Sequence, residues 1–173
     1  MSYALATHSM LNEVMKKLNP ILLNQISNQT MNSLKEKISK DKNSFDIKFI
    51  TEILKQGKQG SFIVPNIAVP GEPGIGIISE NINAIMCLAL NTTDKKFLRH
   101  YNSKYILDLL HIHSFRKGEG KKLMETFLYI QSNLNIPGSL WTESIDNVKY
   151  FEKYGFINLG RLGKSSEFLM KLP

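Results

Sequence analysis

The segment Leu110–Leu123, with the sequence LHIHSFRKGEGKKL, constrains the fold of this chain more than any other feature. It has the pattern of an apolar strand that enters a turn containing Gly118 and Gly120 and continues into a helix. Glycines let backbone N–H groups approach an anion closely, and a helix N-terminus adds unpaired N–H groups and the positive end of its dipole. Four cations surround the same point: Arg116, Lys117, Lys121 and Lys122. The segment therefore predicts a pyrophosphate-binding turn at the end of a strand.

Two other phosphate-binding motifs do not fit this turn. The P-loop pattern G-x-x-x-x-G-K-S/T is absent from the sequence. The dinucleotide fingerprint needs a third glycine and a βαβ unit, whereas Leu123 occupies that position and the preceding region is rich in strands. The turn is therefore a site for another phosphate-bearing ligand, or a surface turn whose basic residues are merely solvated.

The region before residue 60 differs from the rest of the chain, because its apolar residues recur at helical spacing. Asn19-Pro20 breaks the first run, and Gly57 and Gly60 end the last one. The predicted helices are Met10–Leu18, Pro20–Ile26, a segment from Asn28 or Thr30 to Ser39, and Ser44–Leu54.

Strand and helix patterns follow in the order β-β-β-α-β-α-β-β, with Ser61–Val64 as a further short candidate. Lys104–Ile112 is the longest mostly apolar run, which predicts a central strand covered on both faces. The other strands are predicted over Gly76–Ser79, Ala84–Leu90, Leu140–Glu143, Phe156–Arg161 and Glu167–Leu172. The helices are predicted over Lys117–Asn133 and from Ser144 or Asp146 to Gly155.

The composition is that of a folded protein with a basic surface. Hydrophobic residues make up 42%, and 22 Lys and Arg against 15 Asp and Glu give a formal net charge of +7. This charge favours polyanionic partners. Cys87, the only cysteine, allows no internal disulfide and no cysteine-based zinc site. The N-terminus does not have the pattern of a secretory signal, and no apolar run approaches ~18 residues. We therefore expect a cytoplasmic protein with no transmembrane helix.

Two segments resemble the GNAT superfamily of N-acetyltransferases. Leu110–Leu123 resembles motif A of that family, Q/R-x-x-G-x-G/A, with Gly118 and Gly120 on its two small positions. Phe115 stands at the Gln/Arg position, which is a departure from the motif. Tyr150–Phe156, YFEKYGF, resembles the family segment LYEKYGF at the expected distance downstream.

The resemblance implies an α+β fold in three layers. Its sheet is mixed and mostly antiparallel, with a V-shaped splay between two central parallel strands, flanking helices and a helical N-terminal region. One domain would span residues 1–173: residues 1–60 would form a helical part on the acceptor side or at an interface, and residues 61–173 the sheet and cofactor-binding core.

The resemblance also implies acetyl-CoA as the cosubstrate and no metal. The pantetheine arm would lie in the splay against the strand backbone, and the pyrophosphate on the glycine turn. The residues to which it assigns cofactor binding are Leu110, His111, Ile112, Phe115, Arg116, Lys117, Gly118, Glu119, Gly120, Lys121, Lys122, Asn147 and Lys153.

The catalytic groups are less clearly indicated. The family's tyrosine acid corresponds to Phe151, which cannot donate a proton, so Tyr150 is the substitute candidate, with core or cofactor packing as its alternative and favoured role. Asp108 lies in an apolar stretch, so it is either a functional carboxylate or a hydrogen-bonded structural one. Glu143 ends the second splayed strand, where it is either a base or a carboxylate at a helix start.

Three further side chains invite a functional interpretation. His111 and His113 are additional base candidates, and their H-x-H spacing has no evident third metal ligand. Trp141 on the second splayed strand either packs in the core, which we favour, or lines the acceptor pocket.

The sequence therefore predicts an acetyl-CoA-dependent N-acetyltransferase that acts on a primary amine of a small molecule or a protein. The alternatives are a CoA-binding regulatory module without strong catalysis, which the Phe151 position favours, and a basic nucleic-acid-binding protein. Against the last, the cations do not gather with aromatic residues into a reading surface. The long N-terminal region, rich in lysine, is a candidate acceptor surface or homodimer surface.

Overall fold

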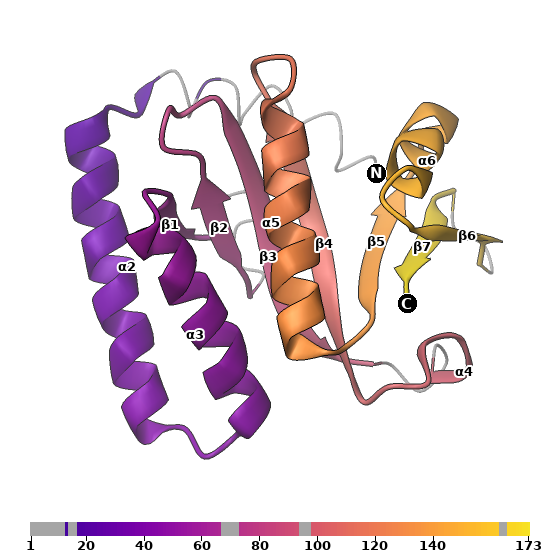
Figure 1. Cartoon of the computed structure of the whole chain (residues 1–173), viewed down its shortest axis with the longest axis horizontal. Helices are drawn as coiled ribbons and strands as arrows, with labels where there is room; N and C mark the ends of the chain where they lie inside the picture. The colour runs from indigo at the N-terminus through magenta and orange to yellow at the C-terminus, as the bar shows by residue number, and fades with distance from the viewer. Residues whose placement is uncertain (1–12, 14–16, 67–72, 94–97, 163–165) are drawn as a thin grey trace.

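A computed structural model describes residues 13, 17–66, 73–93, 98–162 and 166–173. Its centre is a seven-stranded sheet with the order β1-β2-β3-β4-β5-β7-β6 (Figure 1). The strands are β1 (Phe62–Pro65), β2 (Ile75–Ile78), β3 (Ala84–Thr92), β4 (Tyr105–Ser114), β5 (Gly138–Thr142), β6 (Ile157–Arg161) and β7 (Phe168–Leu172). The helices are α2 (Pro20–Lys40), α3 (Ser44–Lys58), α4 (Leu98–Tyr101), α5 (Glu119–Leu134) and α6 (Ile145–Glu152).

The sheet is antiparallel except between β4 and β5, and this parallel pair opens into a V. Its ladder joins only Leu107 to Gly138 and Asp108 to Ser139. Beyond this point β4 continues for six residues and β5 for three, and the two strands diverge (Figure 1). The predicted mixed sheet with a splay between two central parallel strands is confirmed.

The helices α3, α5 and α6 cover one face of the sheet. Figure 1 shows α5 lying across β3 and β4, with α3 on one side of it and α6 on the other. The main core lies under these helices, where Ile53 of α3, Phe127 of α5 and Phe151 of α6 belong to one buried cluster with side chains of β1 to β5 and β7. This arrangement places the N-termini of α5 and α6 at the open end of the V.

The helix α2 covers the edge of the sheet beside β1. The hydroxyl of Ser27 accepts a hydrogen bond of 2.9 Å from the outward N–H of Ile63. Leu23 packs against the second sheet face with Val64 and Ile78. An exposed strand edge can pair with another chain, so this contact protects β1.

The prediction of two helices between Pro20 and Ser39 was wrong, because α2 is continuous. The stretch contains no proline or glycine after Pro20, and Thr30 satisfies its hydroxyl within the helix by donating to the carbonyl of Ile26 at 2.8 Å. The predicted helix Met10–Leu18 lies almost wholly outside the described residues. The helices α3, α5 and α6 and all seven strands lie where the sequence predicted them, to within a few residues.

The strand β4 is central, as predicted, but it is buried on both faces only in part. Ile106, Leu107 and Leu109 are buried, whereas Asp108 and all residues from Leu110 to Ser114 are half-buried. Cys87 on the neighbouring β3 is fully buried and belongs to a second core cluster. No helix in the described part of the chain has the length and apolar character needed to cross a membrane.

Candidate functional site

The turn between β4 and α5 has the backbone that its two glycines predict. Gly118 caps α5 with φ of 93°, a left-handed conformation that favours glycine, and a Cβ there would meet nothing within 4 Å. At Gly120 a Cβ would lie 3.4 Å from the Cβ of Ser114 and 3.7 Å from the hydroxyl of Tyr150. Gly118 is therefore needed for its conformation, and Gly120 keeps space open at the helix N-terminus.

Some backbone N–H groups of this turn donate hydrogen bonds within the described residues, and others, here called uncommitted, do not. The N–H of Phe115 donates to the carbonyl of Asn83 at 2.7 Å, which ties the turn to the β2–β3 connection. Among the described residues, no hydrogen bond engages the N–H groups of Lys117, Gly118 and Gly120. These groups lie at the N-terminus of α5 or just before it, where an anion can be received.

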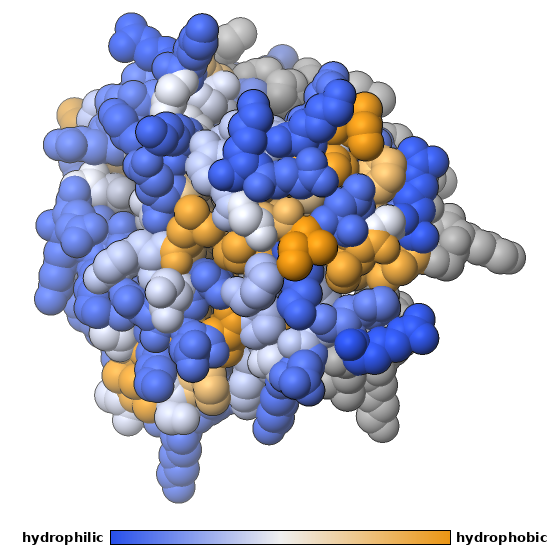
Figure 2. Space-filling view, turned by 45° about the vertical axis from the view of Figure 1, so that its right-hand side comes forward, coloured by the Kyte–Doolittle hydropathy of each residue, from blue (hydrophilic) through white to orange (hydrophobic). Residues whose placement is uncertain are grey.

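A cleft of about 500 Å³ opens beside these N–H groups, between the turn and α6. Figure 2 shows apolar side chains gathered between hydrophilic ones on the face that brings α5 and α6 toward the viewer. The predicted site residues that line the cleft are Ile112, His113, Phe115, Arg116, Lys117, Gly118, Gly120, Lys121, Asn147 and Tyr150. The cleft therefore collects residues from both segments on which the resemblance rested.

Five residues predicted to bind the cofactor are not part of the cleft lining. Leu110 packs on the opposite sheet face, where His111, the register partner of Cys87, also points. Lys153 is exposed at the end of α6. Glu119 and Lys122 form an ion pair of 3.0 Å with each other.

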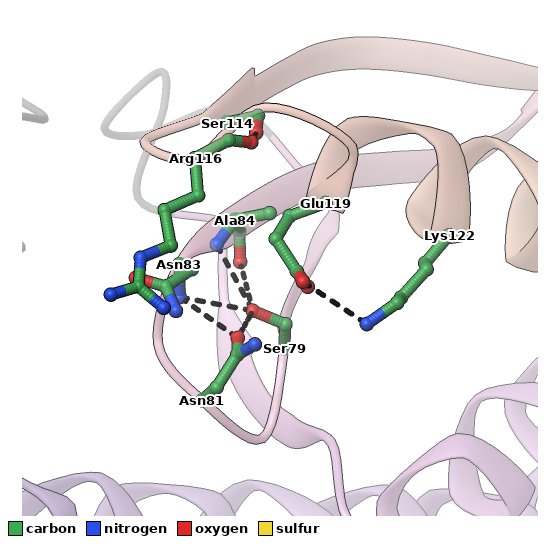
Figure 3. Close-up of polar contacts among 8 residues, drawn as sticks. All are labelled: Ser79, Asn81, Asn83, Ala84, Ser114, Arg116, Glu119 and Lys122. Carbon is green, nitrogen blue, oxygen red and sulfur yellow. Dashed lines mark hydrogen bonds and ion pairs between the residues drawn. The ribbon is translucent and has the colours of Figure 1, made fainter.

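The Glu119 pair sits against the β2–β3 turn, as Figure 3 shows. In this turn the hydroxyl of Ser79 accepts from the N–H groups of Asn83 (3.1 Å) and Ala84 (3.0 Å). Hydrogen bonds from Lys122 and then Asn81 lower the pKa of the Glu119 carboxyl. The β2–β3 turn therefore holds the first turn of α5 in place from the side away from the cleft.

The V between β4 and β5 exposes backbone groups of β4. The register with β3 shifts between Cys87 and Leu88, so Leu110 is an extra residue between the pairs Cys87–His111 and Leu88–Leu109. Such a bulge bends a strand and leaves its extra residue unpaired. Because the β5 ladder stops at Asp108, no strand of the described residues pairs with the β4 backbone beyond it on that side.

At the closed end of the V, Asp108 lies in a polar cluster on the face opposite α5. The side-chain amide of Asn91 donates to Asp108 Oδ2 at 2.6 Å, and the hydroxyl of Tyr101 donates to Ser139 Oγ at 2.8 Å. Burial raises the pKa of the Asp108 carboxyl, against the opposing hydrogen bonds from Asn91 and Ser139. Burial likewise raises the pKa of Tyr101 to about 12.

A second cavity of about 260 Å³ opens over this cluster. Its lining comes from β3, β4, β5, β7, α4 and their ends: Asn91, Thr92, Tyr101, Ile106, Asp108, Ser139, Trp141 and Leu169. Trp141 is 36% exposed and lines this cavity, so the interpretation of Trp141 as a core residue was wrong. Trp141 follows Leu140 in β5, so the two side chains lie on opposite faces of the sheet, and Leu140 packs in the core under the helices.

The other two catalytic candidates lie apart from Asp108. Glu143 is exposed just after β5, and its charge adds to burial in raising the pKa of Glu167. Tyr150 lines the cleft beside Gly120 and accepts a hydrogen bond of 3.3 Å from Tyr154. Burial raises the pKa of Tyr150, so its hydroxyl stays protonated. Phe151 is 6% exposed and turns an edge against Phe156.

His111 and His113 pair with Cys87 and Ile85 of β3, which belong to the second buried cluster, and their ring centres are 6.4 Å apart. His113 also lines the larger cleft. Among the described residues, His, Cys, Asp and Glu side chains form no group of three that could hold a metal ion.

Sequence reasoning missed Asn91, Tyr101 and Ser139. They come from three elements and meet at Asp108 only because β3, β4 and β5 are neighbours. Ser139 lies just before the predicted strand Leu140–Glu143, and the structure shows it as a buried hydroxyl within β5.

The strand order, the single parallel pair and its splay give this chain the GNAT fold. No protein-family model and no curated protein matches the sequence.

Among solved structures, three acyltransferase structures are similar to the chain. An acyl-CoA N-acyltransferase from Pseudomonas aeruginosa is 17% identical, with a TM-score of 0.45 over 71% of this chain and 84% of that one. Arabidopsis thaliana Naa50, in complex with a CoA bisubstrate analogue, is 12% identical (TM-score 0.41; 57% and 70% covered). The PaiA N-acetyltransferase from Thermoplasma acidophilum, in complex with coenzyme A, is 15% identical (TM-score 0.39; 73% and 69%).

Proposed function

We propose that this protein transfers the acetyl group of acetyl-CoA to a primary amine. The observation that carries the proposal is the pairing of two cavities at one splayed strand pair. The larger cleft has uncommitted N–H groups and cations at the open end of the V, and the smaller cavity has the carboxylate of Asp108 at its closed end. A cofactor from one side and an amine from the other would meet along the exposed edge of β4.

The cleft fits the phosphates and the arm of the cofactor. The N–H groups of Lys117, Gly118 and Gly120 would hold the pyrophosphate, with Arg116 and Lys117 supplying side-chain charge. The unpaired β4 backbone around Leu110 and Ile112 would pair with the pantetheine amides. Acetyl-CoA would supply an activated thioester carbonyl, and a β4 N–H near the bulge would stabilise charge on its oxygen.

We assign Asp108 as the general base. As the amine nitrogen forms its bond to the carbonyl carbon, Asp108 accepts the proton that the nitrogen loses, and the carbon–sulfur bond breaks. The raised pKa makes this carboxylate a stronger base than an exposed one. Glu143 is the weaker candidate, because it is exposed and does not line the cavity.

We assign Tyr150 to cofactor binding at the turn, because its hydroxyl lies next to Gly120. At the position of the family's acid the buried ring of Phe151 offers no proton. A thiol with a pKa near ~8.5 leaves readily as a thiolate close to neutral pH, so the leaving sulfur can take its proton from water.

We propose one domain over residues 1–173, in which residues 1–60 border the acceptor side or an interface. The acceptor is an amine on a small molecule or a protein. Trp141 and Tyr101 give its cavity aromatic walls, which suit a cation.

Two glycines offer a matched test of cofactor binding. Gly118 and Gly160 have similar left-handed φ values of 93° and 82°, and a Cβ at either would meet nothing within 4 Å. An alanine at either position costs about 1 kcal/mol or somewhat more in folding stability. We expect only Gly118→Ala to weaken CoA binding, because it shifts the N–H groups of the cradle. Calorimetric titration with CoA measures this, and equal affinities in the two variants would contradict the proposed cradle.

The second candidate function is a CoA-binding module that does not catalyse transfer, which the missing hydroxyl at Phe151 favours. Acetyl-CoA consumption with a panel of primary amines separates the two. CoA binding with no turnover on any amine would favour the module, and RNA or DNA binding without CoA binding would reject both.

A further inference from the structure

A chain of hydroxyl groups joins α4 to the carboxylate of Asp108. Tyr101 donates to Ser139 over 2.8 Å, and both side chains are buried, at 3% and 2% exposure. A serine hydroxyl has one hydrogen, so once Ser139 accepts from Tyr101 it is free to donate that hydrogen onward. The next acceptor is Asp108, which is the register partner of Ser139 in the β4–β5 ladder and lines the same cavity. Hydrogen bonding by Ser139 lowers the pKa of the Asp108 carboxyl. The donors therefore run in one direction, from Tyr101 through Ser139 to Asp108.

We propose that Tyr101 and Ser139 are positioning residues that orient and hold the ionised carboxylate of Asp108 toward the smaller cavity. The proposal rests on the proposed function, in which Asp108 is the base. Asn91 holds the same carboxylate from the other side, at 2.6 Å to Oδ2. Three adjacent strands and α4 thus contribute to one clamp at the last rung of the β4–β5 ladder.

The direction of donation along these hydroxyl groups follows from the protonation of Tyr101. With a pKa of about 12, its hydroxyl remains a donor over the range in which a carboxyl titrates. Among the described residues that line the cavity, Tyr101 is the only titratable group besides Asp108. A change in the ionisation of Asp108 after substitution of Ser139 or Tyr101 therefore reports on this chain.

The test compares two disrupting variants, one conservative variant and two controls. Ser139→Ala removes the hydroxyl that donates to Asp108. Tyr101→Phe removes the hydroxyl whose donation to Ser139 leaves the Ser139 hydrogen for Asp108. Ser139→Thr keeps a hydroxyl. Ser27→Ala and Tyr105→Phe are the controls, because each loses a hydroxyl that hydrogen-bonds in another part of the fold.

The readout is the titration of the Asp108 carboxyl carbon by NMR, in protein without CoA or amine. Each hydrogen bond to the ionised form lowers the pKa of the carboxyl, so its loss raises it. We expect Ser139→Ala to raise the pKa of Asp108 by about one pH unit. Tyr101→Phe should raise it less, and Ser139→Thr and both controls should leave it unchanged. The acid limb of the acetylation pH profile should shift upward in the same order.

Two outcomes separate this inference from the proposed function. If Asp108 titrates alike in wild type, Ser139→Ala and Tyr101→Phe, the positioning role is overturned, whatever the enzyme does. If the NMR titrations shift as expected but the acid limb of acetylation does not follow, the hydroxyl chain is supported and the base role of Asp108 is rejected.

Discussion

The two ends of the V differ in how they are built. The open end is made mainly by one continuous stretch, Ile112–Lys121, in which a strand, two glycines and a helix follow each other. The closed end is made by side chains from β3, β4, β5 and α4, and its hydrogen bonds join residues 17 and 38 positions apart. The first is a local backbone structure that presents N–H groups, and the second is a tertiary cluster that presents one carboxylate.

Because of this difference, we expect anion binding at the open end and carboxylate chemistry at the closed end. Backbone N–H groups at a helix N-terminus bind an anion with little dependence on particular side chains. A half-buried carboxylate depends on each donor that faces it, because burial destabilises its charged form and hydrogen bonds oppose that effect. Substitutions at the open end should therefore change cofactor affinity, and those at the closed end should change turnover.

The largest expected effect tests the closed end. Asp108→Asn removes the base while keeping the size of the side chain, so kcat/KM for amine acetylation should fall by about 10²- to 10⁴-fold. The Kd for CoA, measured by calorimetry, should not change, because Asp108 is not part of the cleft lining. Asp146→Asn, on the exposed first turn of α6, serves as the control and should leave both quantities unchanged.

The same substitution makes a prediction about stability and pH. A carboxyl whose pKa is raised on folding binds more protons in the folded than in the unfolded protein between the two pKa values. Its contribution to stability is therefore present below the unfolded pKa and is lost as pH rises through the folded pKa. Wild type should consequently lose stability relative to Asp108→Asn as pH rises through this range in urea unfolding. A constant difference would contradict the raised pKa.

Much of the fold could be predicted, because its signals are local. Strand and helix periodicity, the proline at the start of α2 and the serine cap of α6 are readable within a few residues. The splay also followed from resemblance, since the turn and YFEKYGF mark where the parallel pair must lie. The division of α2 failed because Asn28 and Thr30 are cap-forming types that a helix can also hold in its interior.

The site could be predicted only at its open end. Gly118 and Gly120 act through backbone geometry, which sequence neighbours determine. Lys153 was predicted to bind the cofactor from its position in YFEKYGF, and it lies exposed just after α6, outside the cleft lining. No local pattern shows that Asn91 and Ser139 meet Asp108, since the register of β3 and β5 against β4 decides it.

An effect of intermediate size tests which lysines contribute to CoA binding at the open end. Lys117 lines the cleft, whereas Lys153 is exposed and is not part of its lining. Lys117→Ala should raise the Kd for CoA by about tenfold at low salt, as expected for a lost charge-assisted hydrogen bond. Lys153→Ala should change it less than about twofold, as for other exposed charges. Calorimetric titrations at two salt concentrations measure both, and a larger effect of Lys153→Ala would place the phosphates elsewhere.

The smallest expected effect concerns Tyr150. If Tyr150 were a catalytic acid, catalysis would take place at the open end of the V, which we assign to cofactor binding. As a cofactor contact beside Gly120, Tyr150→Phe should raise the Kd for CoA by about threefold, the size of one neutral hydrogen bond. The pH profile of kcat should keep its shape, because the leaving thiolate needs no strong acid. Tyr129→Phe, on an exposed part of α5, is the control. An acid role would instead lower kcat by a hundredfold or so with an unchanged Kd. That outcome would place part of the catalytic chemistry at the open end. It would contradict the assignment of cofactor binding to the larger cleft and of catalysis to the smaller cavity.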